Sequence, residues 1–345
     1  MTDCCITCIH VIQHGKTIVN LFIFIDKNGL SVYKRVYTFI YINTSLVLNM
    51  FSEPLKEKIV AHFKNPIRYK HLSVHAENIL GITRYRNVSS FIKKLQVDGI
   101  LNSYKLSAKN KKTVTLYTSL AFLDELSPYD IARAMFPAGY FCNLSSIFYH
   151  SLTNQIPSSI YICNETISSR QEPKVDSLSN NELRNAFIKP HRYTNYVFSF
   201  NNYEIVVVDR EKKSRHGILP ATSSNKIFPK KSSVSSIERA LIDAIVSPQY
   251  NGGITSVYSY FKTAKQKNIN IDRLMDIYRK LNFVYPYYQS IGFFFEKLGM
   301  KKRASAMYDA FLPKQNFYID RNAKTSWKYD DKWKLYYPKE LVDEN

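Results

Sequence analysis

Just after residue 50, apolar residues recur every three or four positions, the spacing of a helix with one buried face. Leu55, Ile59 and Phe63 form this apolar stripe. Ser52 stands where a side-chain oxygen can cap the first backbone N–H groups, and Pro54 stands at the start, where a missing N–H costs nothing. The pattern predicts a helix that begins after Ser52.

The stretch "TRYRNVSSFIKKLQVDGIL" repeats the helical spacing. Its apolar stripe consists of Val88, Phe91, Ile92 and Leu95. Gly99 then supplies a residue that readily adopts the left-handed conformation of a helix end. We therefore expect a helix over 84–98, preceded by a short helix over 74–80.

Beyond Gly99 the period changes to two. "ILNSYKLS" and "KTVTLYTS" alternate apolar and polar residues around the polar loop 108–112, which predicts a β-hairpin. Three helices followed by a hairpin describe a winged helix-turn-helix. In that topology the helix at 84–98 occupies the recognition position.

The rest of the chain carries mixed signals first and helical signals later. The middle region predicts a helix, a turn at 137–139, a second helix to about Leu152, a strand at 159–163, two strands joined at Asn201 and Asn202, and loops at 177–181 and 220–233. From Ser235, amphipathic stretches broken by Gly, Pro or Asn predict a helical bundle. The aromatic tail "TSWKYDDKWKLYYPKEL" predicts a last strand or strap.

The expected fold class is therefore α+β, in four parts. They are an extension of uncertain role over 1–49, with strand-like alternation and Met50 as an alternative start, a winged helix-turn-helix DNA-binding domain over 50–118, a mixed α/β region over 119–234, and a helical bundle with an aromatic C-terminal strap over 235–345.

Charge changes this picture because it is concentrated. The chain carries a net charge of +20, so its field attracts polyanions, although a genome rich in A and T also encodes many lysines. Residues 50–118 hold thirteen Lys and Arg against four Asp and Glu. This segment is a fifth of the chain and holds nearly half of the net charge, which favours nucleic acid as the partner.

The candidate DNA-binding residues lie outside the apolar stripe and in the predicted wing. They are Arg84, Tyr85, Arg86, Asn87, Ser90, Lys93, Lys94, Lys109, Lys111 and Lys112. The N-terminal residues of a recognition helix reach base edges in the major groove, where Arg pairs with guanine and Asn with adenine. The lysines suit phosphate oxygens. The alternative is a solvated basic face used for protein contacts.

Two other functions stay open. Glu211 and Lys213 follow a strand in an E-x-K arrangement like that of metal-dependent nucleases, for which Asp176 or Glu182 would be the second acidic residue. The tyrosine-rich segment at 285–288 could serve a protein-interaction scaffold. We expect no catalytic site, cofactor or metal, and oligomeric state cannot be derived.

Location follows from the apolar and cysteine patterns. The apolar stretch at 18–26 is interrupted by Asn20 and is too short to span a membrane. The five cysteines form no disulfide pattern or zinc template. We expect a cytoplasmic protein without a membrane partner.

Taken together, several segments resemble the AbiEi-type antitoxin family of type IV toxin-antitoxin systems. The resemblance runs from about Met50 to the tail. It is carried by "YTSLAFLDEL", "LSSIFYHSLTNQIPSSIYI", "SSIERALIDAI", "YNGGI" and "YQSIGFFFEKLG", and it is best over 144–161 and 235–299. Residues 1–49 have no counterpart in the family pattern.

The resemblance implies a bacterial transcriptional autorepressor that binds inverted repeats of double-stranded DNA in its own promoter. It also implies an antitoxin, in which 119–234 is an antitoxin-like domain and the C-terminal part counteracts a nucleotidyltransferase-type toxin. The pair would act in abortive infection, an antiviral defence against phage. The family's DNA-facing positions carry over as the helix at 84–98 and its wing.

Overall fold

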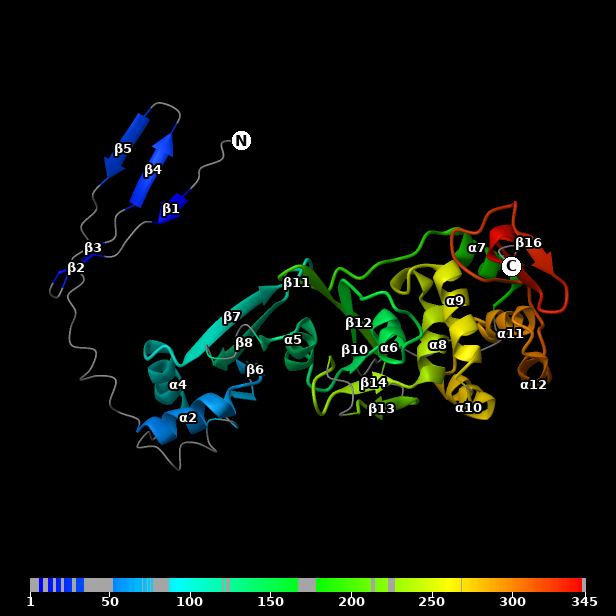
Figure 1. The fold of residues 1–345 in the computed structure, drawn as a ribbon. Coiled ribbons are helices and arrows are strands. Elements are labelled where there is room, and N and C mark those ends of the chain that lie inside the picture. Colours follow the sequence, from blue (N-terminus) through cyan, green and yellow to red (C-terminus); the bar gives the residue numbers. More distant parts are fainter. Residues whose placement is uncertain are drawn as a thin grey trace. The chain divides into compact units, whose positions relative to one another are not determined.

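The protein is described here from a computed structural model (Figure 1). The described residues are five short strands between 6 and 33, and then 52–69, 71, 72, 74, 76, 87–119, 121, 125–166, 178–211, 215–222, 227–267 and 269–342. Contacts divide the chain into two compact units, Met1–Ile59 and Val60–Asn345.

The first unit contains short antiparallel strands. They are β1 (Ile6–Cys8), β2 (Ile12–His14), β3 (Thr17–Val19), β4 (Phe22–Asp26) and β5 (Gly29–Tyr33). β4 pairs with β1 and β5, and β2 pairs with β3. The strands predicted from the alternating pattern are therefore confirmed. Of the side chains in these strands, none lies within the described part of the chain.

The helix predicted after Ser52 is α2 (Glu53–His62). The next elements are β6 (Ile67–Arg68), α4 (Val88–Val97), β7 (Leu101–Ser107) and β8 (Thr113–Ser119). β7 and β8 form the predicted hairpin, and β6 joins β8 to complete a three-stranded antiparallel sheet. Residues 77–86, which include most of the helix expected over 74–80, lie outside the described residues, so the winged helix-turn-helix stays a prediction.

A six-stranded mixed sheet forms the centre of the second unit. Its strands, in spatial order, are β11 (Val197–Phe200), β12 (Tyr203–Glu211), β10 (Ser159–Thr166), β9 (Tyr140–Phe141), β14 (Ser233–Ser235) and β13 (Ile218–Pro220). β10 and β12 run parallel, and β11 and β12 form the hairpin predicted at Asn201 and Asn202. Buried Ile160, Ile162 and Val207 pack with α5 (Pro128–Met135), which begins with a capping box between Ser127 and Asp130.

Helices dominate the chain after the sheet, as predicted. They are α8 (Ile237–Val246), η3 (Pro248–Tyr250), α9 (Ile254–Lys265), α10 (Ile271–Leu281), α11 (Tyr288–Lys297) and α12 (Lys301–Phe311). The tail forms a three-stranded sheet of β15 (Phe317–Tyr318), β17 (Leu335–Tyr337) and β16 (Lys328–Asp330), followed by η4 (Lys339–Leu341). The expected α+β class is therefore confirmed.

The tail is held to the helices by Trp333, which is fully buried. Its ring lies against Gly292 of α11, so close that a Cβ on Gly292 would stand 2.0 Å from a ring carbon. The indole Nε1 donates to Glu296 Oε2 at 2.6 Å. The predicted strap is thus anchored on α11.

Three features differ from the sequence predictions. The helix expected over 84–98 is α4, which begins only at Val88, because Asn87 before it has an extended backbone, with φ of −140°, and caps the helix. α7 (Asn180–Ile188) was not predicted: the stretch 177–181 was expected to be a loop, but Ser179 and Glu182 form a capping box that starts a helix there. The helix predicted to end near Leu152 is α6 (Asn143–Tyr149). Within the described residues, every helix is too short or too polar to cross a membrane.

Candidate nucleic-acid interface

α4 is positioned by its buried stripe and by its cap. Phe91, Ile92 and Leu95 are buried, and Phe91 and Leu95 are fully so. Asn87 caps the helix, since its Oδ1 accepts a hydrogen bond from the backbone N–H of Ser90 at 2.8 Å. The Asn87 side chain, predicted to read adenine, is therefore engaged in starting the helix.

The outer face of α4 is exposed and contains no carboxylate. Ser89, Lys93 and Gln96 lie on one side, because residues three and four apart are neighbours on a helix surface. Ser90 and Lys93 are among the predicted candidates, whereas Ser89 and Gln96, which are exposed on the same helix, are not. Their spacing from Lys93 was the signal that could have identified them.

The two neighbouring lysines of α4 have different environments. Lys93 is exposed, but the Lys94 ammonium forms an ion pair with Asp98 at 2.6 Å, and the two side chains are only 16% and 8% exposed. Lys94 therefore stabilises the end of its own helix. Arg84, Tyr85 and Arg86, the other candidates at the start of the predicted helix, lie outside the described residues.

The tip of the β7–β8 hairpin is docked on the edge strand β11. The backbone N–H of Lys109 donates to Val197 O, and that of Asn110 donates to Asn195 O, both at 3.0 Å. Ala108 pairs with Phe198 in an isolated β-bridge. The hairpin is thus held at its tip by the central sheet and is not a free-standing loop.

The three tip lysines lie together, but two of them have contacts within the chain. Lys109 Nζ lies 2.8 Å from Glu204 Oε1, with both side chains about half exposed, and Lys112 Nζ lies 4.4 Å above the ring of Tyr196. Lys111 is exposed and has a left-handed backbone with φ of 65°. Lys111 is therefore the tip cation most available to a phosphate.

A basic cleft next to this region was not predicted. It has a volume of about 300 Å³ and is lined by eight residues, among them Arg68, His71 and Arg133 but no carboxylate. Arg68 Nη1 donates to the carbonyl of Met135 at 2.9 Å, which joins β6 to the end of α5 across 67 residues of sequence. No local pattern in the sequence could reveal this pairing.

A buried network of charged groups joins the central sheet to α8. Asp243 Oδ1 accepts from Arg239 Nε at 3.0 Å and from Arg210 Nη1 at 2.5 Å. Burial alone would raise the pKa of Asp243, but the two guanidinium groups hold it below its ordinary value. Arg239 also donates to the carbonyl of His216 and to the hydroxyl of Tyr140. Among the described residues these groups pair with one another except for Arg210 Nη2, which is buried without a hydrogen-bond partner, so the network serves mainly to join α8 to the sheet.

The residues weighed for a nuclease do not form a site in the described part of the chain. Glu182 is used in the cap of α7, where its carboxylate accepts from Ser179 N at 2.7 Å and from the Ser179 hydroxyl at 2.8 Å. Asp176, Lys213 and the side chain of Glu211 lie outside the described residues. Among the described residues, no three His, Cys, Asp or Glu side chains gather as metal ligands would.

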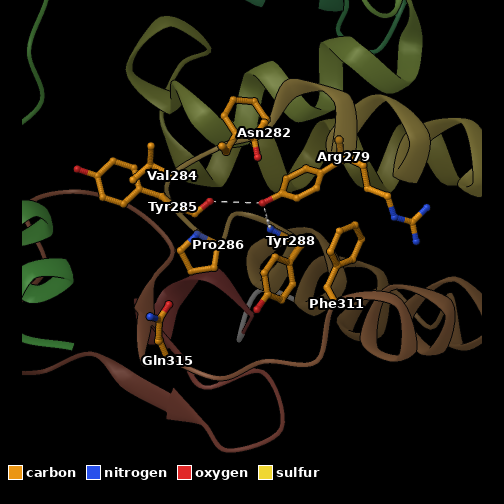
Figure 2. Close-up of a pocket in the computed structure, with 10 residues that line it drawn as sticks. Arg279, Asn282, Val284, Tyr285, Pro286, Tyr288, Phe311 and Gln315 are labelled. Carbon is orange, nitrogen blue, oxygen red and sulfur yellow. Dashed lines mark hydrogen bonds between the residues drawn. The ribbon is translucent and has the colours of Figure 1, made fainter. Parts of the chain in front are cut away.

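The tyrosine-rich segment borders a pocket of about 220 Å³ (Figure 2). Tyr287 and Tyr288 are buried, and Tyr285 is half-buried. The Tyr278 hydroxyl accepts from Tyr288 N and donates to the carbonyl of Tyr285. Most of the cluster therefore belongs to the core, and the pocket is smaller than the roughly 300–1,000 Å³ of ligand sites.

Comparisons with known proteins leave the family of the chain open. No protein-family model matches the sequence, and neither does any curated protein sequence. The chain is similar to a solved structure titled crystal structure of RV2827C protein from Mycobacterium tuberculosis, at 11% identity and a TM-score of 0.45. The match covers 84% of this chain and 93% of that one. At this level the similarity says nothing about function.

Proposed function

We propose that the chain binds double-stranded DNA through α4 and the β7–β8 hairpin, as a transcriptional autorepressor built on a winged helix-turn-helix. The observation that carries this proposal is the outer face of α4, which is exposed and free of carboxylates while its inner face is buried. A helix of this kind, followed at once by a hairpin, matches the order of a winged helix.

Each exposed polar group on this face has a use on DNA, whereas Val97, which is also exposed there, is apolar. Serine hydroxyls and the Gln96 amide can hydrogen-bond base edges, and Lys93 suits a phosphate. Lys111 at the hairpin tip would contact the backbone beside the groove. Arg84 and Arg86, assigned from the sequence, would supply the guanine contacts.

We extend the proposal to an antitoxin of the AbiEi type, which counteracts a nucleotidyltransferase-type toxin. Its support is the resemblance of the motifs over 144–161 and 235–299. Within those motifs Asp243 is fully buried and Glu238 is nearly so. We therefore assign both carboxylates to folding, and we assign contact with the toxin or its target to exposed residues.

DNA binding is tested with a fluorescent duplex that carries the region upstream of the chain's own gene. Anisotropy at 50 to 200 mM salt should show binding that weakens steeply, because each phosphate contact releases counterions. Lys93→Ala/Lys111→Ala should weaken it by about tenfold or more. Lys301→Ala/Lys302→Ala, which removes the same charge from exposed positions on α12, should not. Equal weakening by both pairs would contradict the assignment to α4 and the hairpin.

The antitoxin role is tested by co-expression. A nucleotidyltransferase encoded beside this gene should arrest growth alone, and this chain should restore growth. Rescue should persist in Lys93→Ala/Lys111→Ala, because the antitoxin effect does not need DNA binding. Continued arrest in the presence of the folded chain would refute the antitoxin role and leave the DNA-binding proposal intact.

A further inference from the structure

A groove between α7 and the C-terminal sheet takes no part in the proposed DNA contact. Ten residues line it, and its volume is about 530 Å³, larger than the tyrosine pocket and the basic cleft. This size falls within the roughly 300–1,000 Å³ of small-molecule sites. The groove is therefore large enough for a nucleotide-sized ligand.

The two walls of the groove carry different kinds of side chain. Asn180, Arg184 and Ile188 lie four residues apart, so they share one face of α7. Opposite them, Tyr318 of β15 and Tyr336 of β17 are neighbours in the sheet, and their rings stack at 4.8 Å with planes 15° apart. Phe187 also lies nearly parallel to Tyr318, and Tyr329 is tilted against Tyr336, so aromatic neighbours take up much of the ring faces and leave mainly the edges and hydroxyl groups for a ligand.

Hydrogen bonds at both ends hold the groove open before any ligand arrives. At one end, Asn316 N donates to Asn180 Oδ1 at 2.9 Å. At the other, Ala323 N donates to the carbonyl of Phe187 at 3.2 Å, and Arg321 Nη1 donates to the carbonyl of Ala186 at 2.6 Å. Helix and sheet are thus fixed to each other on either side of the site.

The groove is electropositive. Arg184 and Lys324 line it, both are exposed, and no Asp or Glu is among the ten lining residues. Neither cation forms an ion pair with a carboxylate in the part of the chain that the structure describes. Burial and the neighbouring Tyr336 raise the pKa of Tyr318, while the positive charge of Arg184 lowers it. An anion in the groove would therefore meet two cations that no carboxylate of the described residues pairs with.

We propose that this groove binds a nucleoside phosphate, with Arg184 and Lys324 on the phosphate oxygens. Guanidinium and ammonium groups are the usual partners of phosphate. The amides of Asn181 and Asn316 and the tyrosine hydroxyls can hydrogen-bond a base edge or ribose, and the ring edges can pack against the face of a base. An acidic peptide would use the cations but not this row of amides and phenols.

The test measures binding of a fluorescein-labelled decauridylate RNA to the full chain by anisotropy. Arg184→Gln/Lys324→Gln should raise the dissociation constant about tenfold or more, because two charge-assisted contacts are lost. Lys301→Gln/Lys302→Gln removes the same charge elsewhere and should leave it unchanged. Absence of RNA and nucleotide binding by the wild type, or equal weakening by both pairs, overturns the proposal.

Competitors identify the source of the nucleoside phosphate. Displacement by free UMP or AMP assigns a free nucleotide, and displacement by unlabelled RNA alone assigns a nucleotide within a strand; either supports the site. Displacement by polyglutamate as strong as that by RNA overturns it.

The α4 variant separates this proposal from the DNA-binding one. Lys93→Ala/Lys111→Ala should leave RNA binding unchanged, and the groove variant should leave duplex binding unchanged. RNA binding lost only in the α4 variant would show that RNA occupies the proposed DNA site, which overturns the groove.

Discussion

Arg210 of β12 and Asp243 of α8 form an ion pair across 33 residues of sequence, with Nη1 and Oδ1 2.5 Å apart. The Asp243 carboxylate has no exposed area, and the Arg210 side chain is 19% exposed. A carboxylate removed from water in this way is stable only while its cations remain. The pair therefore links α8 to the central sheet, and removing either partner should lower the free energy of unfolding strongly.

Asp243→Asn should lower the free energy of unfolding by about 3–5 kcal/mol, because it leaves two guanidinium groups without their buried counter-charge. Urea denaturation followed by circular dichroism measures the loss. Asp276→Asn is the matched control, since Asp276 pairs with Lys280 four residues along a helix with both side chains about half exposed. It should cost no more than about 1 kcal/mol. Similar losses in the two variants would mean that the buried network is not essential.

His150 should make stability fall in weak acid. Its Nε2 donates to the carbonyl of Ser235 at 2.7 Å, and burial lowers the pKa of its imidazole. As pH falls below about 6.5, the unfolded chain therefore takes up a proton before the folded one does, and the folded state loses stability. His150→Gln should flatten the dependence of the urea midpoint on pH between 6.5 and 5. An unchanged slope would mean that His150 does not contribute to it.

The docked hairpin tip should show slow amide exchange. Lys109 and Asn110 stand in a turn of exposed residues, yet their N–H groups donate to carbonyls beside β11. An amide exchanges only while its hydrogen bond is open, and these two bonds open only when the hairpin tip separates from β11. Both amides should therefore exchange far more slowly than an unbonded turn amide. Hydrogen exchange followed by NMR measures this. Exchange at the unprotected rate would show that the tip is free.

The adjacent lysines of α4 should behave differently on DNA. Lys93→Ala should weaken duplex binding at every sequence and reduce the slope of log K against log salt by about 1, as expected for one phosphate contact. Lys94→Ala should change that slope less, because the Lys94 ammonium is paired with Asp98. It should instead destabilise the end of the helix. An unchanged slope in Lys93→Ala would place Lys93 off the DNA, and an equal reduction in both variants would mean that Lys94 contacts phosphate as well.

Gly292→Ala should destabilise the anchored tail. A Cβ at this position would lie 2.0 Å from a ring carbon of Trp333, so the indole must move from its buried site. Overpacking of this kind costs about 1–3 kcal/mol or more. The loss should appear as a lower Tm together with a red shift of tryptophan emission. Gly292 lies within α11 and has no positive φ, so the loss would come from this collision and not from backbone strain. An unchanged Tm would contradict it.

The sequence pattern predicted a helix or strand correctly where the residues of that element alone determine its structure. The stripe of Phe91, Ile92 and Leu95 predicted α4, and the alternation on either side of 108–112 predicted β7 and β8. α7 was missed, although Ser179 and Glu182 have the spacing of a capping box. A Ser- and Asn-rich stretch is ordinarily a loop, but here the capping hydrogen bonds stabilise the start of a helix in spite of that composition.

The candidate interface could be predicted only in part, for a related reason. Exposed positions on α4 follow from its period, which identified Lys93. The ion pair of Lys94 and the capping role of Asn87 depend on geometry that composition does not show.

By itself, then, the sequence determined most of the elements in their order and the basic character of residues 50–118, because spacing and charge are local properties. Only the tertiary structure decided which residues far apart in the sequence contact one another. It placed the hairpin tip on β11, joined Arg210 to Asp243, and brought Arg184 and Lys324 to one groove. These contacts depend on how the helices and sheets pack, and the free energy of packing is shared among residues far apart in the chain.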